Sequence, residues 1–237
     1  MDGLTDPTRV RVVFFDAVGT LIHPAPPVGE VYARIARRWG AALDAAEAAR
    51  RFRTAFQRQE DRDRASAYRT SEEREEERWR TIVADVLSDP PDADGPFREL
   101  WDHFARADAW ACYPDVAPCL DALHARGLAL GIASNCDRRL RAVVAGLPAL
   151  HLCTLLVISS AVGWRKPAPA FFQALPELAG CRPAEVLLVG DDWANDYEGG
   201  RANGLQVVYL ARAGAPPGRP ALTSLTDLPH LLLPDPA

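Results

Sequence analysis

Three polar residues closely follow apolar runs that have the composition of buried strands. Asp16 follows VRVVFF, Ser134 follows LALGIA, and Asp191 follows VLLVG. Continuous apolar runs of this kind are typical of strands buried on both faces of a parallel sheet. In such sheets ligands bind at the carboxyl ends of the strands. The spacing therefore predicts that these three residues lie at one edge of a sheet, where the chemistry would take place.

Further groups beside these three residues narrow the chemistry. They are Gly19 and Thr20 after the first run, Asn135 and Asp137 after the second, Asp192, Asn195 and Asp196 after the third, and Lys166 in the separate segment GWRKP. Converging carboxylates cannot all stay ionised without a cation, and Mg²⁺ beside a phosphate is the common solution. Hydroxyls and a compact ammonium can hold an anionic group. Asp16 would be the nucleophile, which predicts group transfer through an aspartyl intermediate.

Each of these residues also has a simpler structural interpretation. An aspartate after a strand is usually a turn or cap residue, and Asn135 and Asp137 can cap the helix that follows them. The aspartates after the third run could form a solvated loop, and Lys166-Pro167 is a common entry to a helix. The four segments nevertheless occur together, each after the expected kind of element. Their combination favours catalysis.

The segment between residues 28 and 109 has helical periodicity and no strand pattern. It predicts an all-helical insert with helices at residues 28–39, 44–64, 71–87 and 97–106. Charges of both signs are dense at residues 58–80, which we interpret as a solvated helix face with i,i+4 pairs.

The rest of the chain alternates between strand and helix patterns. Strands are predicted at residues 10–15, 128–133, 155–158, 186–189 and 206–210, and helices at 116–126, 137–146, 168–178, 194–203 and 225–233. This alternation predicts an α/β fold with a doubly wound parallel sheet.

The four polar segments resemble the four motifs of the haloacid dehalogenase superfamily, in their usual order. The chain is similar to the helical-cap subfamily I, and within it to the branch of haloacid dehalogenase-like hydrolase domain-containing protein 3, also called rhythmically expressed gene 2-like. The similarity is carried by HPAPPVGEVYARIARRWG, RFRTAFQRQ, SNCDRRL, GWRKPAPAFF and GDDWANDYEGGRANG, and it spans nearly the whole chain.

The resemblance implies a Rossmannoid core at residues 1–23 and 111–237, a helical cap at residues 24–110, and Mg²⁺ as cofactor. Asp16 would be the nucleophile, assisted by Thr20 and Lys166. The implied metal ligands are Asp16, the backbone carbonyl of Val18, Asp191, and Asp196 through water or from the outer coordination sphere. The implied ligands of the transferred group are Thr20, Ser134, Asn135 and Lys166.

One residue departs from the phosphatase pattern. Phosphatases of the superfamily have Asp-x-Asp in the first motif, and the second aspartate is a general acid and base worth ~10²–10⁴-fold in rate. This chain has Val18 at that position, and the dehalogenases of the superfamily likewise lack the second aspartate. Unlike the dehalogenases, however, this chain keeps the acidic Gly190-Asp191 segment. We therefore expect an Mg²⁺-dependent phosphatase acting on a small phosphorylated metabolite. The alternatives are a 2-haloacid dehalogenase and a catalytically weak binding protein of the same fold.

Composition limits the partners. The net charge of −5 argues against a nucleic-acid binder, and no apolar run in the 237 residues approaches a membrane span. The N-terminus lacks a signal-peptide pattern. Five cysteines, odd in number and never spaced C-x-x-C, favour a reducing compartment over disulfides or zinc. We expect a cytoplasmic enzyme with a small-molecule substrate, no nucleic-acid or membrane partner, and a monomeric or homodimeric state.

Overall fold

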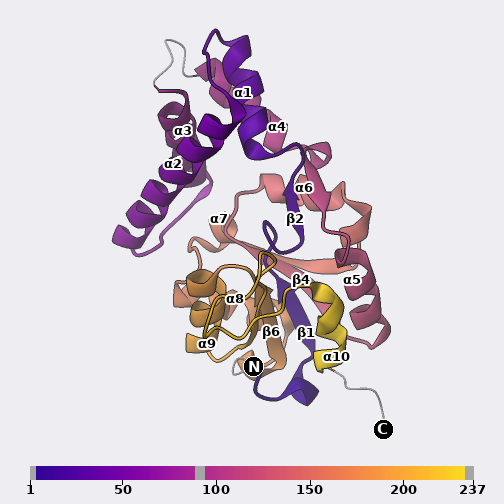
Figure 1. The fold of residues 1–237 in the computed structure, drawn as a ribbon. Coiled ribbons are helices and arrows are strands. Elements are labelled where there is room, and N and C mark those ends of the chain that lie inside the picture. The colour runs from indigo at the N-terminus through magenta and orange to yellow at the C-terminus, as the bar shows by residue number, and fades with distance from the viewer. Residues whose placement is uncertain (1–3, 89–93, 233–237) are drawn as a thin grey trace.

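A five-stranded parallel sheet forms the centre of the computed structural model, which describes residues 4–88 and 94–232 (Figure 1). The strand order is β5-β4-β1-β6-β7. The strands are β1 (Val12–Phe15), β4 (Ala129–Ser134), β5 (Cys153–Ile158), β6 (Val186–Gly190) and β7 (Gln206–Tyr209). Val12 of β1 lies opposite Ala129 of β4 on one side and opposite Val186 of β6 on the other. The predicted doubly wound α/β fold is confirmed.

Helices cover both faces of this sheet, because alternate side chains of each strand enter two separate apolar cores. Val13 and Phe15 pack in one core, and Val12 and Phe14 pack in the other. The first core is covered by α5 (Val116–Ala125), α6 (Arg139–Ala145) and α10 (Leu228–Leu232), and the second by α7 (Ser159–Val162), α8 (Pro169–Ala179) and α9 (Gly199–Ala202). Short 3₁₀ turns lie at Pro7–Arg9, Ala107–Ala109, Pro148–Leu150, Pro183–Glu185 and Leu225–Asp227.

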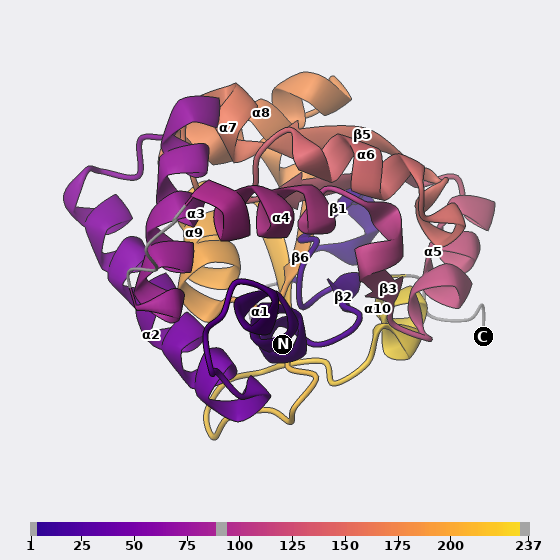
Figure 2. The ribbon, with the colours of Figure 1, turned by 90° about the horizontal axis from the view of Figure 1, so that it is seen from above.

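Four helices precede the second strand of the sheet and form a bundle with an apolar cluster of its own. They are α1 (Val28–Arg38), α2 (Ala45–Ala65), α3 (Glu72–Leu87) and α4 (Asp94–Phe104). The side chains of Asp44 and Ser71 cap α2 and α3 by accepting hydrogen bonds from backbone N–H groups three residues on. The bundle lies over the end of the sheet at which β1, β4 and β6 finish (Figures 1 and 2).

A two-stranded antiparallel ribbon joins the bundle to the sheet. It pairs β2 (Ile22–Pro24) with β3 (Trp110–Cys112), so that Ile22 lies opposite Cys112. The sequence did not predict this ribbon, because three residues with a proline give no readable alternation. The predicted domain boundaries at residues 23/24 and 110/111 pass through the ribbon, and the division into two domains stays a prediction.

Two predicted helices are more irregular than expected. Residues 194–203 begin as a π-helix (Trp193–Glu198) and continue as α9, while residues 225–232 form a 3₁₀ turn followed by α10. Residue 233, the last of that predicted helix, lies outside the described residues. None of the helices in the described ranges is long and apolar enough to cross a membrane.

The interpretation of residues 58–80 as a solvated face is wrong for three of its charged residues. Asp63, Glu75 and Arg78 are each 1% exposed. Most ion pairs of this segment connect different elements, such as Arg78 of α3 with Asp63 of α2, instead of successive turns of one helix. The periodicity of the charges gave the helices correctly but could not show that a further element covers them.

Candidate active site

Lys166 connects two of the predicted site carboxylates. Its Nζ donates hydrogen bonds to Asp16 Oδ1 at 2.7 Å, to Asp196 Oδ1 at 2.6 Å and to the backbone oxygen of Ala133 at 2.9 Å. All three protons of the ammonium therefore have acceptors. Asp16 follows β1, and its backbone N–H donates to Val189 of β6, which fixes the start of the loop against the sheet.

The charge of Lys166 is stabilised by its surroundings. Burial by itself lowers the pKa of this ammonium, but the carboxylates of Asp16 and Asp196 outweigh burial and raise the pKa above its usual value. Lys166 is also the only lysine in a chain whose other side-chain cations are all arginines. A tetrahedral ammonium can donate to three converging acceptors in a small space, whereas a planar guanidinium cannot.

Asn135 holds the backbone of Lys166 from both sides. Its Oδ1 accepts from the Lys166 N–H at 2.7 Å, and its Nδ2 donates to the Lys166 carbonyl at 3.0 Å. The amide thus positions the lysine, and its predicted role as a substrate ligand stays a prediction. Ser134, the last residue of β4, is 3% exposed, and its hydroxyl makes no hydrogen bond to the described residues. That hydroxyl is free to bind an anionic group.

Asp191 is held against the loop that follows β1. The Thr20 hydroxyl donates to Asp191 Oδ1 at 3.0 Å, so the hydroxyl proton of this predicted site residue is bound by the Asp191 carboxylate. Gly19 has φ +94°, and a Cβ at this position would come within 2.2 Å of Asp191 Oδ2. Only glycine satisfies both the left-handed backbone and the close approach.

The site carries more negative than positive charge. Asp16 and Asp196 bind the single ammonium of Lys166, and Asp191 lies near enough for the charges of all three to act on it. Burial, and after it the charges of Asp16 and Asp196, together raise the pKa of Asp191 to about 7 against the opposing effect of Thr20 and Lys166. A divalent cation bound beside Asp191 would remove this imbalance.

Three oxygen atoms on two loops have no hydrogen-bond donor within the described chain: Asp16 Oδ2, Asp191 Oδ2 and the carbonyl oxygen of Val18. Hard oxygen donors of this kind, completed by water, are what Mg²⁺ requires, so the residues fit this ion. No set of three or more histidine, cysteine or acidic residues in the described ranges is arranged to hold a metal. The set that fits Mg²⁺ has two carboxylates and a carbonyl.

Asp196 is less suited to direct coordination. Its Oδ1 accepts from Lys166, and its Oδ2 accepts from the backbone N–H of Asp192 at 3.1 Å. Asp192 is also engaged, because its carboxylate caps the π-helix by accepting from the backbone and side-chain amides of Asn195. Val18 is 42% exposed and offers no proton. Neither Asp192 nor Asp196 therefore has a free oxygen with which to replace the missing acid and base.

The structure adds supporting residues that no sequence pattern indicated. Arg212 donates to the carbonyl oxygen of Thr20 at 2.7 Å and forms a two-point ion pair with Asp115. Asp115 in turn accepts from the side chain of Ser224 and the backbone of Leu225. This chain of contacts fixes the backbone of the loop after β1. The residues that it joins are between 97 and 192 positions apart in sequence, so no local sequence pattern could indicate them.

Comparison with known proteins gives consistent results. A family model described as haloacid dehalogenase-like hydrolase matches residues 10–204. The haloacid dehalogenase-like hydrolase domain-containing protein 3 of Mus musculus is 30% identical over 230 residues, which cover 94% of this chain and 90% of the mouse protein. A phosphoserine phosphatase of Thermus thermophilus is 32% identical over 139 residues, covering 57% of this chain and 55% of that protein. Among solved structures, a defluorinating L-2-haloacid dehalogenase superposes with a TM-score of 0.77 at 24% identity, covering 94% of this chain and 95% of that one.

Proposed function

The chain belongs to the haloacid dehalogenase-like hydrolase family, and we propose that it is an Mg²⁺-dependent phosphatase that uses Asp16 as nucleophile on a small phosphorylated metabolite. The observation that carries this proposal is the group of oxygens on Asp16, Asp191 and Val18 that accept no hydrogen bond within the described residues, which suits a hard divalent ion. The similarity of 139 residues to a phosphoserine phosphatase supports the same substrate class.

The proposed reaction has two steps, both centred on Asp16. A carboxylate oxygen of Asp16 attacks phosphorus, an O–P bond forms, and the ester O–P bond breaks; the alcohol or phenol oxygen leaves as an anion or takes a proton from solvent. Water then attacks the phosphorus of the aspartyl phosphate, the bond between phosphorus and the Asp16 oxygen breaks, and the proton lost by the water goes to the released phosphate or to solvent, which restores the carboxylate. The hydroxyl of Ser134 would hold a phosphoryl oxygen, and the positive charge of Lys166, whose three protons are already donated, would attract the phosphoryl group. Mg²⁺, held by Asp16, Asp191 and the Val18 carbonyl, would neutralise developing negative charge.

A second candidate activity follows from Val18. Hydrolysis of a 2-haloacid needs no general acid, because halide leaves without a proton. Asp16 would form an ester with C2 as the carbon–halogen bond breaks, and water would hydrolyse that ester. The excess of carboxylates beside Asp16 disfavours this candidate, since at a site without a metal ion a carboxylate substrate would add another negative charge with nothing to offset it.

We also propose that helices α1–α4 act as a cap, with residues 24–110 as the cap domain and residues 1–23 and 111–237 as the core. Their separate apolar cluster and their position over the carboxyl ends of β1, β4 and β6 support this division (Figure 2). All five cysteines are free thiols, which fits a reducing compartment such as the cytoplasm.

One experiment separates the two activities. Purified protein is assayed with a panel of phosphate esters and 2-chloroacids, each with millimolar Mg²⁺ and with a chelator. Release of phosphate that the chelator abolishes is the expected result. Chloride release that is indifferent to the chelator, with no phosphate release, would replace the phosphatase by the dehalogenase.

A further inference from the structure

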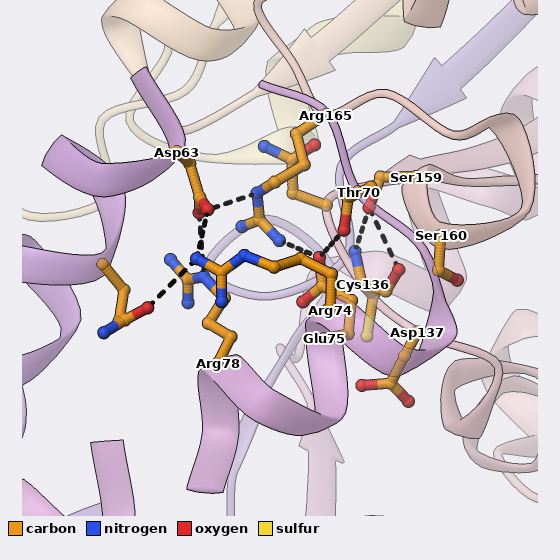
Figure 3. Close-up of polar contacts among 12 residues, drawn as sticks. Asp63, Thr70, Arg74, Glu75, Arg78, Cys136, Asp137, Ser159, Ser160 and Arg165 are labelled. Atoms are coloured by element: carbon orange, nitrogen blue, oxygen red, sulfur yellow. Dashed lines mark hydrogen bonds and ion pairs between the residues drawn. The ribbon is translucent and has the colours of Figure 1, made fainter. Parts of the chain in front are cut away.

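Arg165 is a buried arginine whose side chain leaves the sheet and enters the helical bundle. Its guanidinium forms ion pairs with Glu75 of α3 and, both at 3.4 Å, with Asp63 and Glu60 of α2. Figure 3 shows it between Asp63 and Glu75. The residue is 3% exposed. A charge so far from water is stable only with partners of this kind.

The backbone around Arg165 is held by the turn that joins the same two helices. The Arg165 N–H donates to the carbonyl of Tyr68 at 2.9 Å, and the Thr70 N–H donates to the carbonyl of Gly163 at 3.1 Å. Arg69 and Trp164 form a bridge between these two contacts, and the Arg69 guanidinium stacks on the Trp164 ring. The turn between α2 and α3 therefore pairs with the segment that leads directly to Lys166.

Arg165 and Lys166 are neighbours whose side chains serve different parts of the molecule. Successive side chains of an extended segment point to opposite sides. Arg165 binds the helices, whereas Lys166 binds Asp16 and Asp196 at the sheet. Asn135 binds both the N–H and the carbonyl of Lys166 from the loop after β4, and the contacts of Arg165 add a restraint from the helices.

The ion pairs show that the helices depend on this arginine. Arg78 pairs with Asp63 and Glu60, and Arg74 pairs with Asp63, all within α2 and α3. Glu75, which is 1% exposed, has Arg165 as its ion-pair partner among the described residues and otherwise accepts from the Thr70 hydroxyl. The bundle thus carries a buried carboxylate whose counter-charge comes from the segment beside Lys166.

We propose that Arg165 is a positioning residue, which fixes Lys166 against Asp16 by tying the segment Gly163–Lys166 to helices α2 and α3. The proposal deepens the proposed function and rests on it wherever turnover is measured. A buried ion pair contributes little net stability compared with apolar residues of the same volume. Its retention beside a site lysine is explained by the geometry it imposes.

The test compares two buried arginines of one cluster. Arg165→Gln and Arg78→Gln each remove a guanidinium that binds Asp63 and Glu60, but only Arg165 adjoins Lys166. With the best ester of the substrate panel, Arg165→Gln should lower kcat by roughly 10–100-fold, as expected for a misplaced catalytic group. Arg78→Gln should keep kcat near the wild-type value, even if its melting temperature falls as much as that of Arg165→Gln.

A second readout needs no turnover. Because Lys166 is the only lysine, this side chain and the N-terminal amine are the only aliphatic amines that acetic anhydride can convert to amides, and the N-terminal amine serves as internal reference. Mass spectrometry of peptic peptides then gives the acetylation rate of Lys166 in the folded protein. Arg165→Gln should raise that rate by roughly tenfold or more, since local opening controls access to a buried group. Arg78→Gln should leave it unchanged.

A double variant separates positioning from charge balance. Arg165→Gln with Glu75→Gln removes both charges, so the melting temperature should recover relative to Arg165→Gln while kcat and Lys166 protection stay low. Recovery of all three together would overturn the proposal, as would equal losses in Arg165→Gln and Arg78→Gln. If the wild type hydrolyses no ester, the proposed function fails, and the acetylation rates still decide whether Arg165 positions Lys166.

Discussion

At the scale of single residues, the site can bind charge but has little capacity to move protons. The Lys166 ammonium is held by three acceptors and its pKa is raised, so it keeps its protons. The Thr20 hydroxyl donates to Asp191, and Asp196 is occupied by Lys166 and a backbone N–H. Val18 stands where phosphatases of the superfamily have their general acid, and its side chain has no proton to donate. In the reaction we propose, the leaving group would therefore depart with little help from a proton donor.

Asp16→Asn tests the nucleophile. The amide has nearly the shape of the carboxylate but does not attack phosphorus, so turnover should fall by a factor on the order of 10⁶, as when a covalent mechanism loses its nucleophile. The measurement is the steady-state rate on the best ester, together with circular dichroism to show that the fold persists. Asp192→Asn is the matched control, because Asp192 is an exposed helix cap and asparagine caps equally well. Near-normal hydrolysis by Asp16→Asn would mean that another group attacks.

Val18→Asp tests the missing acid. The wild type should turn over acyl and aryl phosphates faster than alkyl phosphates, since the former leave without protonation. The aspartate should raise the rate on alkyl phosphates by ~10²-fold, the lower end of what a general acid and base contributes. The half-exposed position of Val18 leaves room for the carboxylate. Comparison of aryl and alkyl rates, with Val18→Asn as the control of equal shape, measures the effect. A wild type that is equally fast on both classes, and unaffected by the aspartate, would identify another residue as the acid.

At the scale of elements, the strands and helices that carry the site were predictable because each has a strong local pattern. VRVVFF, LALGIA and VLLV are buried apolar runs, and the residues after them do converge where the central strands β4, β1 and β6 end. Contacts between distant loops were not predictable. The ion pair of Arg212 with Asp115 and the bond from Thr20 to Asp191 each join residues about 100 or more positions apart. The local periodicity of a sequence contains no information on such pairs, because the residues come together only when the chain has folded.

Gly19→Ala tests the loop after β1. Two effects add at this position, the left-handed backbone and the collision of a Cβ with Asp191. Gly127→Ala is the matched control, because Gly127 has φ +80° and nothing within 4 Å of an added Cβ. The control should lose about 1–2 kcal/mol of unfolding free energy from the backbone alone. Gly19→Ala should lose more and should also weaken Mg²⁺ binding, because Asp191 is displaced. Urea unfolding and a Mg²⁺ titration of activity measure both losses; equal losses in the two variants would show that Asp191 tolerates the methyl group.

At the scale of the whole molecule, three apolar clusters are joined by polar contacts. Two clusters cover the sheet and the third lies within α1–α4. The helices contact the rest through Arg165, through Ser160 donating to Glu72, and through Arg139, which stacks on Trp101 and donates to its carbonyl. Sequence reasoning found the strands and helices that carry these clusters from their apolar spacing, but it placed the charges of residues 58–80 in water. A mixed-charge helix face has the same pattern whether water or another element covers it.

Mg²⁺ binding should therefore stabilise more than the loops that hold it. An ion that binds only the folded state at 100 times its Kd adds about 2.7 kcal/mol of unfolding free energy. For a chain of this size 1 kcal/mol moves Tm by roughly 2–4 °C, so Tm should rise by roughly 5–10 °C. Because Arg165 and its neighbours tie the helices to the sheet, the wild type should show a single melting transition, and Mg²⁺ should shift it. In Arg165→Gln the helices should melt in a separate transition, which Mg²⁺ leaves unchanged while it shifts the transition of the sheet. Scanning calorimetry with and without Mg²⁺ follows both.

Asp191→Asn should lose most of the shift and Asp192→Asn should keep it, since only Asp191 has a free oxygen beside Asp16. No shift in the wild type at millimolar Mg²⁺ would remove the metal from the proposal and leave Val18 and Asp16 as the first motif of a dehalogenase.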